Sequence, residues 1–214
     1  MKILNLYAGI GGNRKLWEDV DVVAIENNSK IAEIYQDFFP NDEVIIADAH
    51  QYLLEHFKEF DFIWSSPPCP SHSMFRKNFS CNVGAKPIFP DMKLYEEILF
   101  LQYYFKGDWA VENVISYYKP LIEPQLLQRH YFWSNKELRP REFGKNRKFP
   151  KDTINLTGGK NEHEKQQVKR LQEKLGINIE KYSGNKRLML RNCVLPELGL
   201  YIFQEAIKKP KRLF

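Results

Sequence analysis

Cys69 occupies a proline-rich turn, SSPPCPSHS at 65–73, in which Pro67 and Pro68 precede the cysteine. Because proline fixes φ and has no N–H to donate, the turn is stiff and presents the thiol in a fixed direction. A thiolate held in this way can attack an electron-poor carbon, whereas a structural cysteine is inert and usually lies inside an apolar element. His72 could pair with Cys69 as a metal ligand or a protease dyad, but no second ligand pair accompanies it and near neighbours in an irregular loop seldom form that dyad. We therefore interpret Cys69 as a nucleophile.

A carboxylate and an arginine follow further along the chain. Glu112 lies in VENV at 111–114, where flanking valines predict a partly desolvated carboxylate that can hold or share a proton. The alternative is a structural carboxylate paired with a nearby arginine. Arg129 lies in QRHYF at 128–132, and its guanidinium could donate hydrogen bonds to a carbonyl oxygen. The alternative is an ordinary surface residue, which an isolated arginine more often is. Cys69, Glu112 and Arg129 are the candidate catalytic residues.

Three successive apolar runs end in residues that suit a nucleoside. The first is followed by YAGIGG at 7–12, where glycines at a strand-to-helix turn let the backbone approach a ligand. Its spacing departs from the dinucleotide pattern, so NAD is disfavoured and a plain tight turn is the alternative. Glu26 ends the second run and is placed to accept from ribose hydroxyls. Asp48 ends the third and could accept from an adenine amino group, although each acid could instead be a helix N-cap or an exposed charge. Together they predict a pocket for an adenosine-bearing ligand without a pyrophosphate.

The elements that position these residues follow a strand-helix rhythm. Short apolar runs separated by stretches of helical spacing are typical of a doubly wound α/β fold with a parallel sheet. In that architecture ligands bind outside the carboxyl ends of the strands, where the candidate residues lie. The expected strands are 2–7, 21–25, 43–47, 61–65 and 108–113, a further strand opens near 130–135, and the expected helices are 11–19, 29–39, 50–58, 91–105 and 161–176.

Length and composition restrict the class of protein. The chain has 214 residues and 43% hydrophobic residues, enough for about one packed domain with an additional lobe. No apolar run approaches the ~20 residues needed to cross a bilayer. The three cysteines form no C-x-x-C pair, so we expect neither a disulfide framework nor a metal site. The N-terminus shows no signal-peptide pattern, and we expect a cytoplasmic protein.

The basic charge is segregated along a chain whose net charge is +5. Residues 1–133 contain 12 Lys and Arg against 18 Asp and Glu, whereas residues 134–190 contain 15 against 7. A basic region attached to a mildly acidic one suits a polyanion-binding enzyme, because Lys and Arg release counterions from phosphates. The alternative is a solvated lysine-rich surface. We predict a catalytic domain formed by 1–133 and 191–214, interrupted by a small target-recognition region at 134–190.

The order of these motifs resembles the cytosine-C5 DNA methyltransferase family. The resemblance is carried by YAGIGG, VAIENN, ADAH, SSPPCP, VENV, PQLLQRHYF and RNCVLPELG, in the family order and at both ends of the chain. Amino-methyltransferases carry Pro-Pro-Tyr at the turn where this chain has Pro-Pro-Cys. The chain departs from the family at Arg191, where a glycine usually precedes the asparagine.

The resemblance implies a Rossmann-like fold, S-adenosyl-L-methionine as the methyl donor and double-stranded DNA as the substrate. Cys69 would attack C6 of a flipped-out cytosine, Glu112 would act at N3 and Arg129 at the O2 side. It further implies a prokaryotic or phage-encoded protein with an accompanying restriction enzyme. A tRNA cytosine-C5 methyltransferase and a catalytically weak nucleic-acid-binding protein of the same fold are the alternatives. The implied cofactor residues are Tyr7, Gly9, Gly11, Glu26, Asn27, Asp48, Pro67 and Asn192, and the implied nucleic-acid contacts are Ser73, Arg139, Arg141, Lys145, Arg147 and Lys148.

Overall fold

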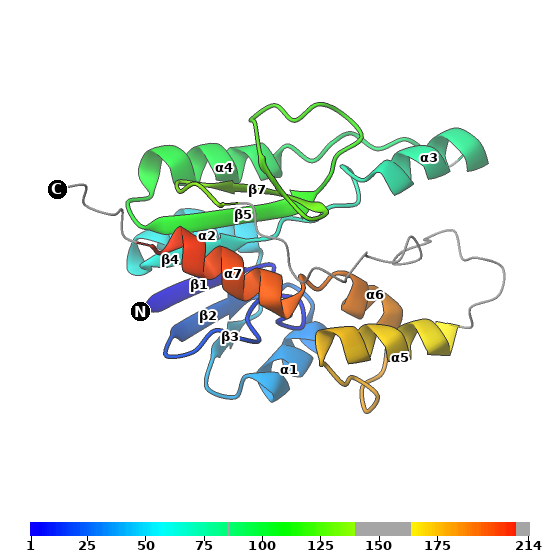
Figure 1. Cartoon of the computed structure of the whole chain (residues 1–214), viewed down its shortest axis with the longest axis horizontal. Helices are drawn as coiled ribbons and strands as arrows, with labels where there is room; N and C mark the ends of the chain where they lie inside the picture. Colours follow the sequence, from blue (N-terminus) through cyan, green and yellow to red (C-terminus); the bar gives the residue numbers. More distant parts are fainter. Residues whose placement is uncertain (85, 140–163, 209–214) are drawn as a thin grey trace.

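A single twisted sheet forms the centre of the molecule (Figure 1). The computed structural model describes residues 1–84, 86–139 and 164–208. The strand order is β3-β2-β1-β4-β5-β7-β6. Strands β1 to β5 are parallel, and β7 runs antiparallel to both β5 and β6. The strands are β1 (Lys2–Leu6), β2 (Asp21–Ile25), β3 (Glu43–Ile45), β4 (Phe62–Ser65), β5 (Asp108–Val114), β6 (Gln125–Leu127) and β7 (His130–Ser134).

The helices begin at recognisable caps. Asn28 accepts N–H bonds from the first turn of α1, and Pro196 opens α7, where its missing N–H leaves no backbone donor unpaired. The helices are α1 (Ser29–Phe38), α2 (Ala49–His56), α3 (Met74–Val83), α4 (Lys93–Tyr104), α5 (Glu164–Leu175), α6 (Lys186–Arg191) and α7 (Pro196–Ala206), with a short 3-10 turn at Phe57–Glu59.

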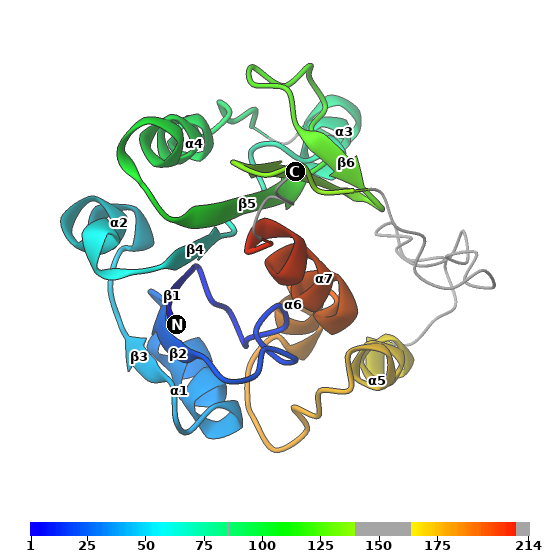
Figure 2. The ribbon, with the colours of Figure 1, turned by 60° about the vertical axis from the view of Figure 1, so that its left-hand side comes forward.

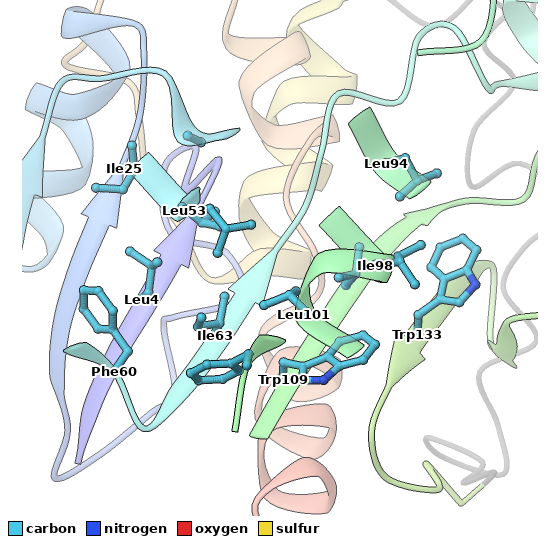
Figure 3. Packing of buried hydrophobic residues seen from close by; sticks show 14 of the residues in the cluster. Leu4, Ile25, Leu53, Phe60, Ile63, Leu94, Ile98, Leu101, Trp109 and Trp133 are labelled. Carbon is cyan, nitrogen blue, oxygen red and sulfur yellow. The ribbon is translucent and has the colours of Figure 1, made fainter. Parts of the chain in front are cut away.

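Both faces of the sheet are covered. Successive residues of a strand point to opposite faces, so the mostly buried central strands contribute to two cores. On one face, Leu4 of β1 and Ile63 of β4 pack with Leu53 of α2 and Leu101 of α4 (Figure 3). On the other face, α7 packs against alternate residues of β1, β4 and β5. Figure 2 shows α2 and α4 on one side of these strands and α7 on the other. The expected doubly wound α/β fold is therefore confirmed.

Most of the expected elements are present, whereas α3, α6, α7 and β6 were not expected and one expected helix did not form. The five expected parallel strands are present, and helices form where 29–39, 50–58, 91–105 and 161–176 predicted them. The expected helix at 11–19 is wrong, because this segment consists of turns. Trp17 in this segment donates its indole N–H to the Gly199 carbonyl at 3.3 Å, and its ring centroid lies 5.0 Å from that of Phe203. Both partners belong to α7, which therefore covers the face of the sheet on which a helix at 11–19 would pack.

Residues 164–190 pack against the first half of the chain. Leu175 of α5 and Leu190 of α6 share an apolar cluster with Ile34 of α1 and with Ile10 of the glycine-rich loop. This part of the predicted target-recognition region therefore contacts α1 and the glycine-rich loop. Its separate role remains a prediction. Across the described ranges, no helix is long and apolar enough to cross a membrane, and no group of three His, Cys, Asp or Glu side chains is arranged to hold a metal ion.

Candidate active site

The candidate residues meet at the carboxyl edge of the sheet. Leu6 at the end of β1 pairs with Ile25 of β2 and with Ser65 of β4, and Ser65 pairs in turn with Val111 of β5. Parallel strands in register bring their carboxyl ends to one edge, so the loops after β1, β2 and β4 and the end of β5 lie side by side. This edge holds the residues predicted for both the cofactor and the nucleophile.

Glu26 binds the glycine-rich loop. It is 9% exposed, and its Oε2 accepts the Gly9 N–H at 3.0 Å while its Oε1 accepts the Asn28 N–H at 3.0 Å. Each carboxylate oxygen can accept a further hydrogen bond. Gly9 has a φ of +55°, and a Cβ built on it would meet nothing within 4 Å. The loop therefore borders open space next to a buried carboxylate.

Gly11 serves a different purpose from Gly9. Its φ is +78°, and a Cβ there would lie 2.2 Å from a ring atom of Phe39. Glycine is required at this position both by the left-handed backbone and by the close approach of the aromatic ring. The structure thus places Gly9 at the open side of the loop and Gly11 at its packed side.

The other predicted cofactor residues have different surroundings. Asn27 is exposed, and Asp48 is the N-cap of α2, accepting the Gln51 N–H at 2.9 Å. That backbone hydrogen bond holds the pKa of Asp48 below its usual range. Pro67 is buried and its carbonyl accepts from the Asn113 side chain at 3.0 Å, while Asn192 is exposed at the end of α6. Cofactor contacts by these residues remain predictions.

Cys69 is held in a tight turn after β4. Its carbonyl accepts the N–H groups of His72 at 3.0 Å and Ser73 at 3.1 Å. Burial, and after it the negative charge of Glu112, raises the pKa of the thiol to about 11, while the positive charge of Arg191 opposes this rise. The thiol is therefore protonated near neutral pH, and two opposite charges act on it.

Glu112 is paired with a histidine. Its Oε1 lies 2.5 Å from Nδ1 of His130, and its side chain is 10% exposed. In the antiparallel pair of β5 and β7, Glu112 lies opposite Phe132 and His130 lies opposite Val114, so the two polar side chains are diagonal neighbours on one face. Sequence reasoning missed His130. His130 lies two residues before Phe132 and so on the same face of the strand, which was the available signal. This signal identifies His130 as a neighbour of Glu112 only when the register of β5 and β7 is known.

Arg129 and Arg191 have contrasting surroundings. Arg129 is exposed in the turn between β6 and β7, beside Gln128 with a φ of +56°, and makes no ion pair with a described residue. Its action on a bound base remains a prediction. Arg191, the departure from the family pattern, has a buried Nε with no hydrogen-bond partner among the described atoms, and burial lowers its pKa. A partly buried guanidinium whose positive charge acts on the thiol is a feature that sequence reasoning did not assign.

Glu97 is a second residue that sequence reasoning missed. It is fully buried on α4, and its carboxylate accepts from the Tyr7 hydroxyl at 2.6 Å and from the Ser65 hydroxyl at 2.6 Å. Nδ1 of His50 lies 3.0 Å from the same carboxylate. The signal was an acid on the buried face of α4, three residues after Leu94.

The predicted nucleic-acid contacts are only partly described. Ser73 is the N-cap of α3 and accepts the Arg76 N–H at 3.2 Å. Arg139 is exposed, and its carbonyl accepts from the Tyr201 hydroxyl. These contacts leave the nucleic-acid roles of both residues as predictions. The remaining four residues, Arg141, Lys145, Arg147 and Lys148, lie outside the described residues.

The fold and the site define a class of protein. A seven-stranded sheet with one reversed strand, β7, and a glycine-rich loop after β1 is the Rossmann-like fold of S-adenosylmethionine-dependent methyltransferases. Residues 1–93 match the family model described as C-5 cytosine-specific DNA methylase. The resemblance to this family that the motifs predict is thereby confirmed. No curated protein sequence is significantly similar to the chain.

Solved structures give weaker likenesses. One is a mutant of DNMT2 from Spodoptera frugiperda, with 19% identity over 66% of this chain and 53% of that one and a TM-score of 0.46. Another, described as a DNA modification methyltransferase encoded within a prophage, comes from E. coli and has 15% identity over 63% of this chain and 46% of that one, with a TM-score of 0.42. The chain thus spans about half the length of these two proteins.

Proposed function

We propose that the chain is a DNA (cytosine-5-)-methyltransferase that transfers a methyl group from S-adenosylmethionine to C5 of a flipped-out cytosine. The observation that carries the proposal is the pairing of Cys69 with Glu112. Cys69 follows β4 and Glu112 lies near the end of the adjacent parallel strand β5, where its negative charge raises the pKa of the thiol. A sulfur nucleophile beside an acid-base group is the pair that addition to C6 and proton handling at N3 require.

The cofactor side fits an adenosine-bearing molecule. Gly9 borders open space, and both oxygens of the buried Glu26 retain capacity to accept from ribose hydroxyls. Tyr7, Asn27, Asp48, Pro67 and Asn192 complete the proposed set. Bound there, S-adenosylmethionine would supply an electrophilic methyl group.

The chain's own residues account for the other steps. Cys69 loses its proton and its sulfur forms a bond to C6 of cytosine, which moves the ring electrons toward C5. Glu112 holds or donates the proton at N3, and Arg129 stabilises charge at O2. His130 keeps one oxygen of Glu112 occupied at 2.5 Å, so the other is available to the base. After methyl transfer, C5 gives its proton to solvent and the C–S bond breaks with its electron pair on sulfur, which restores the ring and releases a thiolate that regains a proton from solvent.

Base access requires the nucleic acid to deform. C5 and C6 are hidden within a duplex, so the cytosine must be flipped out at a cost of a few kcal/mol. We propose that Ser73, Arg139 and the basic residues of 134–190 offset this cost through contacts with the backbone. A cytosine-C5 methyltransferase that acts on tRNA is the second candidate, because the pair of Cys69 and Glu112 would serve either nucleic acid. An accompanying restriction enzyme remains a prediction.

Covalent trapping tests the proposal. Fluorine at C5 of cytosine cannot leave as a proton does, so the adduct with Cys69 persists and retards the protein in a denaturing gel. With S-adenosylmethionine present, we expect an adduct on duplex DNA containing 5-fluorocytosine, and none with Cys69→Ser, which should still bind the cofactor. An adduct formed only on tRNA would move the proposal to the second candidate. Cofactor binding with no adduct on either nucleic acid would reject methyl transfer.

A further inference from the structure

We infer that Glu97 is a positioning residue that fixes the cofactor loop and the nucleophile loop through one buried carboxylate. The inference rests on the proposed function, and it concerns a residue outside the predicted set. Glu97 is 0% exposed on α4, where an unpaired carboxylate would be strongly unfavourable. Its donors come from the ends of two different strands and from α2.

The first donor lies at the start of the cofactor loop. Tyr7 follows β1 with a φ of +56°, a left-handed conformation that is unfavourable for a tyrosine. The Tyr7 hydroxyl donates to Glu97 at 2.6 Å. The next two residues are held through their backbone N–H groups, since Ala8 donates to the Ile25 carbonyl and Gly9 to the Glu26 carboxylate. Because both ends of Tyr7 are bound, its ring and the backbone leading to Gly9 keep one orientation.

The second donor lies at the start of the nucleophile loop. Ser65 is the last residue of β4 and is fully buried, and its hydroxyl donates to the other oxygen of Glu97 at 2.6 Å. The rigid turn to Cys69 begins at the next residue. One carboxylate therefore binds the residue before each loop, and a shift of α4 would displace both loops together.

The third contact places the imidazole of His50 beside the carboxylate of Glu97. Nδ1 of His50 lies 3.0 Å from Glu97, and its Nε2 lies 3.4 Å from Glu96. The hydrogen bond that His50 donates to Glu97 raises the pKa of His50, while burial and the nearby Lys93 oppose that rise. These groups, together with Asp48 and Asp91 near Tyr7, are the charges that surround the buried carboxylate.

Paired variants separate positioning from a purely structural role. Tyr7→Phe removes only the hydroxyl, so the dissociation constant for S-adenosylmethionine should rise about tenfold, a larger change than the accompanying fall in the trapping rate at saturating cofactor. Ser65→Ala should give the reverse, a trapping rate about tenfold lower with cofactor affinity within about twofold. Glu97→Gln should impair both quantities. Tyr182→Phe is the control, because its hydroxyl also donates to a carboxylate, that of Asp37 at 2.8 Å, rather than to Glu97.

The outcomes are distinguishable. Calorimetry gives the dissociation constant, gel retardation with 5-fluorocytosine gives the trapping rate, and thermal unfolding is measured on every variant. If Tyr7→Phe and Ser65→Ala change both quantities equally and in proportion to their loss of thermal stability, or change neither, the positioning role is overturned. A wild-type protein that neither binds the cofactor nor forms the adduct would instead overturn the proposed function, and the inference with it.

Discussion

The ionisation of Cys69 provides a direct test of the electrostatics at the site. Burial and Glu112 raise the pKa of this thiol from 9.0 to about 11. The difference of about two units corresponds to about 2.7 kcal/mol and to a roughly hundredfold smaller thiolate population at pH 8. Because the thiolate is the species that reacts with alkylating reagents, iodoacetamide should modify Cys69 about a hundredfold more slowly than an unperturbed thiol at that pH.

The assay measures the rate of alkylation between pH 7 and pH 11.5 by mass spectrometry of the peptide that contains Cys69. Cys81 is exposed on α3 and is followed in the same digest as an internal reference. Cys193, whose pKa burial raises to about 12, should stay unmodified over most of the range. The rate at Cys69 should still be rising at pH 10.

Glu112→Gln extends the test to the second cause of the shift. Removing the negative charge should lower the midpoint of the alkylation profile, whereas the burial contribution should remain. A wild-type midpoint near pH 9 would refute the reasoning for the thiol as a whole. A raised midpoint that is unchanged in Glu112→Gln would refute only the proximity of the carboxylate.

Three further predictions follow from the contacts. Gly11→Ala should lower the free energy of unfolding in urea by more than about 2 kcal/mol, because it adds a clash with the Phe39 ring to an unfavourable left-handed φ. Gly84→Ala is the control, since Gly84 has a similar φ with open space around it, and it should lower the free energy of unfolding by less. The pair of His50 and Glu97 should stabilise the fold below about pH 6.5, because the pKa of His50 is raised, and this stabilisation should be lost as pH rises through the folded-state pKa. The melting temperature of His50→Gln, measured against pH, should therefore lack this pH-dependent stabilisation. Identical pH profiles for the variant and the wild type would contradict the assignment. Glu26→Ala should weaken S-adenosylmethionine binding by about 1–3 kcal/mol in calorimetry, and unchanged affinity in a folded variant would place the adenosine pocket elsewhere.

The parallel strands could be predicted because their signal is local. A run such as Asp21–Ile25 is short and almost wholly apolar, which is typical of a strand buried on both faces. The helix expected at 11–19 failed because its fate is decided by α7, a helix far away in the sequence. Trp17 has the spacing of a helical residue, but it packs against Phe203 of α7 instead. Periodicity cannot reveal which of two segments will cover a given face.

The site divides in the same way. Cys69 and Glu112 stand out in the sequence because a proline turn and an acid between valines are unusual in themselves. His130 could not be assigned, since its contact with Glu112 depends on the register of β5 and β7. Glu97 resembles one more acid of a charged helix until the fold buries it. The proposed catalytic groups stood out in the sequence, whereas the residues that contact them or the loops before them required the structure.

The charges around Cys69 favour a thiol that loses its proton only after the base has bound. Burial is the larger cause of its raised pKa and would increase when a base enters the site, so a bound substrate alone would make ionisation harder. Glu112 would lose its opposing charge if it took up a proton from solvent in order to donate a hydrogen bond to N3 of the cytosine, which carries no proton of its own, and the second cause would then be removed. Arg191, with an unpaired Nε and a positive charge that lowers the pKa of Cys69, would then act on the thiol without a competing carboxylate. On the proposed function, binding of the correct base and formation of the nucleophile are thus coupled through Glu112, and the departure from the family pattern at Arg191 supplies the charge that favours the thiolate.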